Sequence, residues 1–344
     1  MEWKTELLKV PANRGGAIQV AGRPSFLLSN EFGLMVGICV FVGIFTLIDA
    51  NFWSGFNLFV LSRAAGIYAL IGLSMMVVIV TGGLNLAVGA IGVCAAMIFG
   101  FSIEGMGTHW LVGMVLALML AMVLGFINGW LVVRTGIHSF VITLATMSVF
   151  FGGMVFLTQG QSYRALPAAV TDFGRMKLMN SVSSLFVAAV VIAVVLALMY
   201  RFTPTGREML AAGATPEAAE LSGINTGRSF ILCHVLSALL AGVTALLVTS
   251  RYGAAMPSMA GQLGQDWLMP AFLAPVLGGT VLAGGRVAVL GTVLGAILVT
   301  TLTNGLLRLS VGEFWVQAIL GCLLLLAVLG DKARKKYLSL RGLA

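Results

Sequence analysis

The side chains that could do chemistry within the apolar part of this chain are amides and hydroxyls rather than acids and bases. Such groups exchange hydrogen bonds with water and with a solute alike, so a path built from them suits a neutral, polyhydroxylated molecule. The same side chains could instead bond across helices, as polar residues in membrane bundles often do. The residues that we expect along such a path are Gly82, Gly83, Asn85, Asn128, Thr143 and Asn304.

Groups arranged for catalysis or metal binding are missing. His109, His138 and His234 lie far apart in the sequence, without HxxxH or carboxylate spacing, which argues against a metal site or a general base. The sequence contains no nucleophile-elbow motif, and the four cysteines show no CxxC spacing. We therefore expect no catalytic residue, no metal site and no cofactor bound to this chain.

The acidic residues bear on the energy source. All twelve fall in loops, tails or the ends of apolar runs. A proton- or sodium-coupled carrier usually keeps an ionisable group in mid-membrane, so self-powered secondary transport is disfavoured. No Gly-Lys dipeptide occurs, hence no Walker A loop that would hold a nucleotide. Energy for transport must come from another chain, or the protein is a passive facilitator.

The composition predicts an integral membrane protein. Of 344 residues, 59% are hydrophobic and 9% are charged, which a water-soluble domain could not carry without large exposed apolar patches. Apolar runs of about 20 residues predict helices that cross a bilayer. We place ten spans, at 32–49, 57–80, 86–103, 110–133, 140–158, 183–200, 230–249, 268–284, 288–307 and 314–330.

Basic residues orient these spans. With the N-terminus inside, fourteen of the twenty Lys and Arg lie on the inner side, as the positive-inside rule requires. The net charge of +8 therefore indicates membrane orientation and not nucleic-acid binding. We expect an all-α polytopic protein with both termini cytoplasmic: a basic segment (1–31), a membrane domain (32–330) and a basic tail (331–344).

One uncharged run, 64–102, is too long for a single helix at ordinary tilt. The Gly82-Gly83 pair is where it should break, and a break in mid-membrane is tolerated only where the backbone faces protein or a watery cavity. We therefore expect this segment to line the path. A similar string, GGxxLAxG, recurs at 278–285 and hints at duplicated halves, although coincidence is a fair explanation in a chain this rich in Gly, Ala and Leu.

The central loop, 201–229, is polar and lies between two apolar runs, on the cytoplasmic side by the charge bias. Thr215-Pro216-Glu217 is a good helix start, with a hydroxyl cap, a proline in the first turn and an acid near the positive helix end. Gly223 is the matching stop. The loop therefore predicts a short helix held outside the membrane.

This loop resembles a known one. Glu217-Ala218-Ala219, followed by Gly223 and Ile224-Asn225, is similar to the EAA loop of permease subunits of bacterial ABC importers, in the form found in ribose/xylose/arabinose-type sugar permeases. Further stretches resemble motifs of that family in the expected order, from about residue 60 to 330. They are 81–89 (family TGGIDLSVG), 125–129 (GxxNG), 140–147 (FIVTLATM) and 277–286 (IGGTSLSGGRG).

The resemblance implies a permease subunit in the bacterial inner membrane. Its central loop would dock as a coupling helix onto a separate ATPase that binds ATP and Mg²⁺, while a periplasmic binding protein delivers the solute. A second permease subunit, identical or different, would complete the path. The small alanines would permit close approach, the acid would pair or cap, and the glycine would let the backbone turn. The implied coupling residues are Glu217, Ala218, Ala219, Gly223 and Arg207.

Departures from the family pattern leave the solute open. Asn85 stands where the family usually has Asp, His138 where it often has Pro, and Gln265-Asp266-Trp267 where Glu-Leu-Asp is common. A branched-chain amino-acid permease of the same superfamily and a stand-alone passive facilitator are the alternatives. A non-transporting scaffold would explain the spans but not the central loop.

Overall fold

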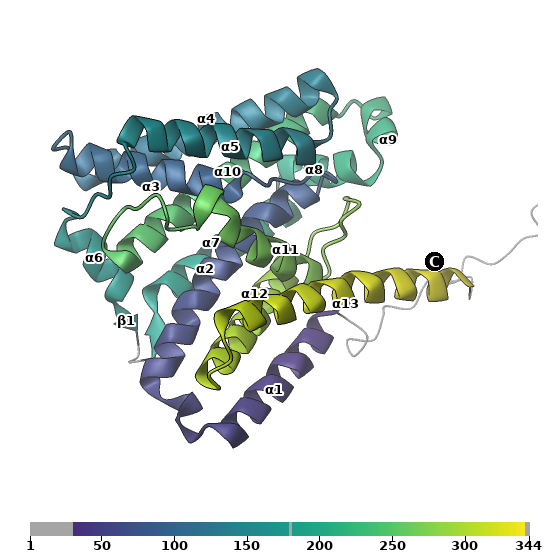
Figure 1. The fold of residues 1–344 in the computed structure, drawn as a ribbon. Coiled ribbons are helices and arrows are strands. Elements are labelled where there is room, and N and C mark those ends of the chain that lie inside the picture. Colours follow the sequence, from purple (N-terminus) through teal and green to yellow (C-terminus); the bar gives the residue numbers. More distant parts are fainter. Residues whose placement is uncertain (1–29, 179–180, 341–344) are drawn as a thin grey trace, which may run out of the picture.

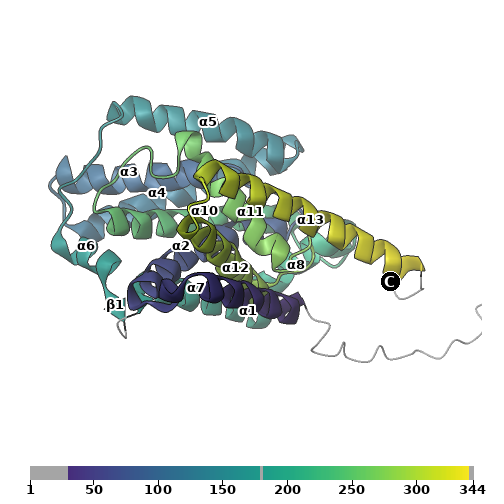
Figure 2. The ribbon, with the colours of Figure 1, turned by 60° about the horizontal axis from the view of Figure 1, so that its bottom comes forward.

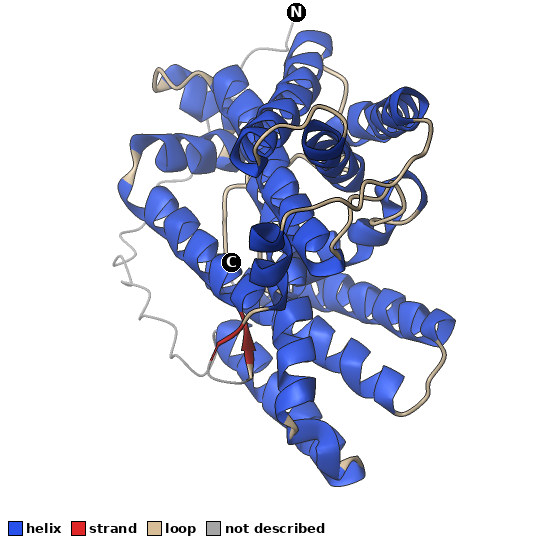
Figure 3. Ribbon diagram, turned by 90° about the vertical axis from the view of Figure 1, so that its left-hand side faces the viewer, coloured by secondary structure: helices blue, strands red, loops and turns tan. Residues whose placement is uncertain are grey.

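The computed structural model describes residues 30–178 and 181–340, and most of them are helical (Figure 3). Within that part of the chain, seven helices are long and apolar enough to cross a membrane. They are α1 (Asn30–Ile48), α2 (Gly55–Ile79), α4 (Trp110–Thr135), α5 (Ser139–Thr158), α7 (Ser184–Phe202), α10 (Thr226–Tyr252) and α12 (Val289–Arg308). Two further apolar helices are α3 (Val88–Glu104) and the first part of α13 (Glu313–Leu340).

The remaining elements are short. They are the helices α6 (Ala168–Arg175), α8 (Pro204–Ala214), α9 (Pro216–Leu221) and α11 (Leu268–Leu277), the 3₁₀ helices η2 (Ala50–Trp53) and η3 (Gln262–Trp267), and the antiparallel strands β1 (Lys177–Leu178) and β2 (Val182–Ser183). Each predicted span therefore corresponds to a helix, and the all-α polytopic fold is confirmed. The predicted basic segment 1–31 lies almost wholly outside the described residues, as do the last residues of the tail, 341–344.

Helices α2, α3 and α10 form the centre of the bundle. Within the most apolar 18-residue stretch of each helix, 78% of the residues of α2 and 61% of those of α10 are buried. The corresponding shares are 11% in α1 and 17% in α5. Figures 1 and 2 show α1 and α5 on opposite sides of the molecule. The outer helices carry exposed apolar side chains such as Leu47 and Phe156, as expected of surfaces that face lipid.

The two ends of the bundle differ. Figure 1 shows α9 at one end and α6 with β1 at the opposite end. By the charge bias of the sequence, the α9 end is cytoplasmic and the α6 end is outside. The terms inner and outer follow this orientation below.

The predicted break is present between α2 and α3, at residues 80–87, and this segment is called the break below. The backbone turns at Gly82, whose φ is +75°, and helix geometry resumes only at Val88. The N–H groups of Gly82 and Gly83 donate to the carbonyls of Ile79 (2.8 Å) and Val78 (3.3 Å). This pair of bonds is a Schellman motif, in which a left-handed glycine satisfies the last carbonyls of a helix.

The eighth predicted span is helical only in its first half, because α11 ends at Leu277 with the same motif. Gly279 has φ +84°, its N–H donates to Val276, and the N–H of Thr280 donates to Pro275. The structural counterpart of Gly82 is thus Gly279, one residue later than the alignment of the GGxxLAxG strings implies. The similar strings accordingly mark two helix ends of the same design.

Candidate functional site

The predicted cytoplasmic helix is α9, and its start differs from the prediction in one respect. Thr215 occupies the cap position and Pro216 the first turn, but the Thr215 hydroxyl makes no capping hydrogen bond. The acid in the first turn is Glu217, as expected. Proline and the helix dipole therefore define this start without a hydroxyl cap.

The end of α9 confirms the predicted glycine stop. Gly223 has φ +81°, and its N–H donates to Glu220 (2.9 Å) while the N–H of Ile224 donates to Ala219 (3.0 Å). A Cβ at Gly223 would meet no atom within 4 Å, so glycine is required here for its backbone conformation and not for space. Beyond the turn, the Thr226 hydroxyl donates to the Glu220 carboxylate at 2.5 Å.

The two alanines of the motif face opposite ways. Ala218 is exposed together with Glu217, and Leu221 is 92% exposed, whereas Ala219 is buried under the helix. Only Ala218 therefore presents a small surface to a partner. Arg207 is exposed on the preceding helix, α8.

The C-terminal end of α8 packs directly on the break. A Cβ added at Gly213 would overlap the Val80 carbonyl oxygen. That oxygen also accepts the N–H of Gly285 at 2.8 Å, from the loop that follows α11. A Cβ added at Gly284 would likewise clash with the backbone of Gly213 and of Gly82. The end of α8 thus touches the glycine-capped end of α2 and the loop that follows α11.

Side chains of α5 satisfy the broken backbone. The Leu84 N–H donates to the Ser139 hydroxyl (2.8 Å), and the Leu86 N–H donates to the Thr143 hydroxyl (3.0 Å). Thr143 in turn donates to the Ser139 carbonyl at 2.7 Å. Thr143, expected along the path, is fully buried and holds the break in place.

Asn85 is also engaged within the protein. Its side-chain amide donates to the Ser237 hydroxyl (3.0 Å), and its oxygen accepts the Ala87 N–H (3.1 Å). The side chain is fully buried. In this structure Asn85 therefore joins the break to α10, which is the bridging role that sequence reasoning left open for these polar residues.

A cavity of about 880 Å³ lies between the break and α9. Two of the expected path residues, Gly82 and Gly83, line one side of the cavity, and Glu220 and Gly223 line the other side. Val132, Val133, Ile137 and Phe230 give it an apolar wall, with Thr81, Ser139 and Thr226 as polar groups. Helix α9 and the break therefore border one cavity at the inner end.

The last two expected path residues lie elsewhere. Asn128 is fully buried on α4, where neither side-chain atom has a hydrogen-bond partner. The neighbouring Gly129 packs on the α10 backbone at Ile231. Asn304 donates to the Asn57 side chain at 3.1 Å, near the outer end of α12. The structure therefore gathers four of the six residues and not these two.

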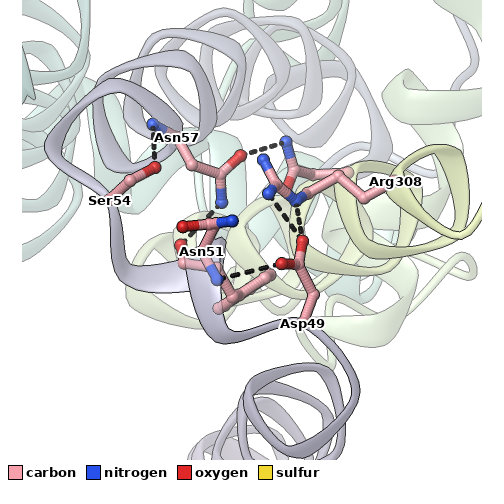
Figure 4. A network of polar contacts seen from close by, with 7 residues as sticks. Asp49, Asn51, Ser54, Asn57 and Arg308 are labelled. Atoms are coloured by element: carbon pink, nitrogen blue, oxygen red, sulfur yellow. Dashed lines mark hydrogen bonds and ion pairs between the residues drawn. The ribbon is translucent and has the colours of Figure 1, made fainter.

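Asn304 belongs to a polar network that ties α1 to α12 (Figure 4). Arg308 donates to the Asp49 carboxylate at 2.6 Å and forms an ion pair with it at 2.5 Å. The Asn51 N–H also donates to this carboxylate (2.9 Å). The Asn51 N–H and the Arg308 guanidinium hold the pKa of Asp49 below its usual value of 3.8.

Four cations gather at the outer end. The Phe59 ring lies 5.1 Å from both the Arg63 guanidinium and the Lys177 ammonium. Arg251 is close enough to Arg63 for electrostatic repulsion, and Arg175 lies beside Gly253, just after α10. No ion pair involves any of the four within the described residues, where the one pair found joins Arg308 to Asp49.

Sequence reasoning missed a segment that enters the bundle from outside. Ala255 and Tyr163 exchange backbone hydrogen bonds of 2.9 and 2.8 Å, level with Gly100 near the outer end of α3. The chain then descends to Gly264, which lies against Gly89 in the first turn of α3. The distance from Gly100 to Gly89 along the axis of α3 is roughly 16 Å, from the helical rise per residue.

The bottom of this descent is η3. Trp267 is buried, and its ring lies against Gly92 of α3. Gly92 also adjoins the carbonyl of Ala241, in the middle of α10. Gln262, Gln265 and Asp266 are exposed. From the sequence we expected Asp266 at the end of a membrane span. A non-helical segment that enters the bundle could have been recognised from its turn-forming residues, which are Gly253, Pro257, Gly261 and Gly264.

Among the described residues, no group of three or more His, Cys, Asp and Glu side chains could hold a metal ion. Cys39, Cys94, Cys233 and Cys322 are free thiols.

Comparisons with known proteins agree with this architecture. The family described as "Branched-chain amino acid transport system / permease component" matches residues 57–328. The ribose import permease of Bacillus subtilis is 33% identical, over 89% of this chain and 94% of its own length, and that of Escherichia coli K12 is 28% identical, over 92% and 98%. An autoinducer 2 import permease of Yersinia enterocolitica is 32% identical, over 76% and 79%. No solved structure matches the chain.

Proposed function

Because the chain belongs to the permease-component family of ABC importers, we propose that it forms the path for a neutral monosaccharide and is driven by a separate ATPase through the loop 201–229. It is a multi-pass protein of the bacterial inner membrane and a transport subunit, not an enzyme. The stand-alone facilitator does not fit this membership. The proposal concerns the solute, the coupling residues and the assembly.

The sugar assignment is supported by the relatives and by the cavity. The relatives described above are named for ribose and autoinducer 2 rather than for an amino acid, although the family description mentions branched-chain amino acids. The cavity at the break carries the hydroxyls of Thr81, Ser139 and Thr226. Hydroxyl groups suit a polyhydroxylated solute, whereas an amino acid would need charged partners for both its ends.

The coupling assignment is carried by one observation: α9 and the break border the same cavity. A partner pressing on the exposed Ala218 and Leu221 could move α9 as a rigid body, and α8 would carry that movement to the break. Glu217 and Arg207 would supply charged contacts at the edge. We assign ATP and Mg²⁺ to the partner ATPase.

The outer end offers a docking surface for the binding protein that an importer of this kind requires. We assign this role to the four outer cations Arg63, Arg175, Lys177 and Arg251, because unpaired positive charges attract an acidic surface and accelerate encounter. A second permease subunit, identical or different, would close the path on the remaining side.

Reconstitution tests the function. The chain is placed in liposomes with its ATPase and binding protein, and uptake of labelled ribose, xylose, arabinose and leucine is measured with and without ATP. We expect ATP-dependent uptake of one of the sugars, which leucine does not compete away. Uptake of leucine alone would refute the sugar assignment, and sugar uptake without ATPase would refute the coupled mechanism.

A further inference from the structure

We propose that the exposed edge of η3, formed by Gln262, Gln265 and Asp266, is a solute-binding site at which the Asp266 carboxylate accepts hydrogen bonds from sugar hydroxyls. This inference rests on the proposed function and names a group that contacts the solute.

The depth of η3 in the bundle is the first argument. Gly264 lies against Gly89, and the Trp267 ring lies against Gly92, which itself adjoins the Ala241 carbonyl in the middle of α10. The chain that leads to η3 pairs with Tyr163 through Ala255, at the outer end of α3. Asp266 therefore follows a descent from the outer surface and stands near mid-membrane, not at the water boundary.

An exposed carboxylate at this depth needs an explanation. A charged side chain that faces hydrocarbon is costly, so intramembrane acids normally face a watery cavity or a partner. Asp266 forms no ion pair within the described residues, and its neighbours Gln262 and Gln265 are exposed as well. The edge of η3 must therefore face the water-filled path between subunits.

The chemistry of this edge fits a polyol. A carboxylate offers two acceptor oxygens, which match adjacent hydroxyl donors, and the two amides both donate and accept. The edge carries no cation to balance the carboxylate of an amino acid; the four cations described above lie at the outer end. A neutral, hydroxyl-rich solute is the class that such a site would select.

The backbone holds the edge in place. Leu263 adopts φ 57°, which residues other than glycine seldom adopt, and the buried Trp267 fixes the next turn. The contact of Gly264 with Gly89 joins η3 to the helix that begins just after the break. A movement of the break would therefore reposition the site relative to the solute.

Water access is the first test. Asp266→Cys is made in a chain whose exposed Cys39 and Cys322 are replaced by serine, and the complete complex is treated with a membrane-impermeant thiosulfonate reagent. We expect rapid modification, because the edge of η3 faces water. Val195→Cys, exposed on α7, is the matched control and should remain unmodified. Failure of the reagent to reach position 266 would overturn the inference.

Solute recognition is the second test, with Asp266→Asn in the reconstituted complex. Loss of a hydrogen bond to a charged group predicts a fall in uptake of roughly tenfold or more. The preference for the sugar over its deoxy analogues should shrink, while ATPase stimulation by the binding protein persists. Asp172→Asn, an exposed acid on α6, should transport normally. Gln262→Ala tests the same edge should Asp266→Asn fail to insert.

The outcomes separate the two proposals. If the wild-type complex imports sugar, and Asp266→Asn shows the same uptake and the same preference over deoxy analogues, the binding site is refuted and the function is not. A wild-type complex that imports no sugar would refute the function itself.

Discussion

Gly223 shows how one residue can be read from the sequence with its reason. The helix signal requires a stop there, and the structure gives it φ +81° with both hydrogen bonds of a Schellman motif. His138 is a second case: it replaces the proline common in the family, at φ −55°, which a proline would also adopt, and its Nδ1 accepts the Phe140 N–H at the start of α5.

Replacing Gly223 by valine should uncouple transport. A left-handed conformation costs a residue with a Cβ on the order of 1 kcal/mol or more, so the end of α9 should tilt. We expect sugar uptake and stimulated ATPase activity to fall while the protein still inserts. Gly160→Val, with φ +66° and open space outside the membrane, is the matched control. Normal uptake with normal stimulated ATPase activity in Gly223→Val would contradict the coupling role.

The Asp49–Arg308 pair predicts a pH dependence. The pKa of Asp49 is lower in the folded protein than the usual 3.8, so its stabilising effect is present above that pH and is lost as the pH falls through the folded pKa. Thermal unfolding in detergent should show Asp49→Asn slightly less stable than wild type near neutral pH, and equally stable in strong acid. The difference should be small, because exposed ion pairs contribute little. A difference that grows in acid would show that the sign is wrong.

At the scale of elements, the central question is how α9 reaches the break. The helix that does so is α8, which carries two closely packed glycines. Gly206 lies on α7 at Met199 and Tyr200, whereas Gly213 lies on Val80 of the break. Both positions are too tight for a Cβ, but they contact different elements, which separates a packing effect from a coupling effect.

Gly213→Ala should uncouple the complex, because the added methyl overlaps the Val80 carbonyl and must separate α8 from the break. We expect sugar uptake per ATP hydrolysed to fall several-fold, within the usual range of coupling between sites. Gly206→Ala should lower the amount of folded protein without changing that ratio. Equal ratios in the two variants would indicate that α8 does not transmit movement to the break.

At the scale of the whole molecule, we propose that different partners dock at the two ends. The inner end presents α9 and the cavity, and the outer end presents the four cations. Import requires both, since solute arrives at one end and energy at the other.

Charge reversal tests the outer end. Lys177→Glu should reduce uptake and weaken binding of the solute-loaded binding protein, with the loss largest at low salt, because screening hides such interactions at high salt. Arg164→Glu, an exposed outer cation not assigned to the four, is the control. Measurement of binding-protein affinity on immobilised complex decides the matter; an unchanged affinity in Lys177→Glu would exclude these cations as the docking surface.

The helices, the break and the cytoplasmic turn could be predicted before the fold was known, because apolar run length, glycine pairs and proline are local signals. What these residues touch depends on how distant segments pack together. Thr143 and Asn85 were recognisable as polar residues in apolar runs, yet their partners come from other helices. The depth of Asp266 likewise depends on where η3 packs, since a carboxylate at a helix end and one held in mid-bundle have the same local sequence pattern.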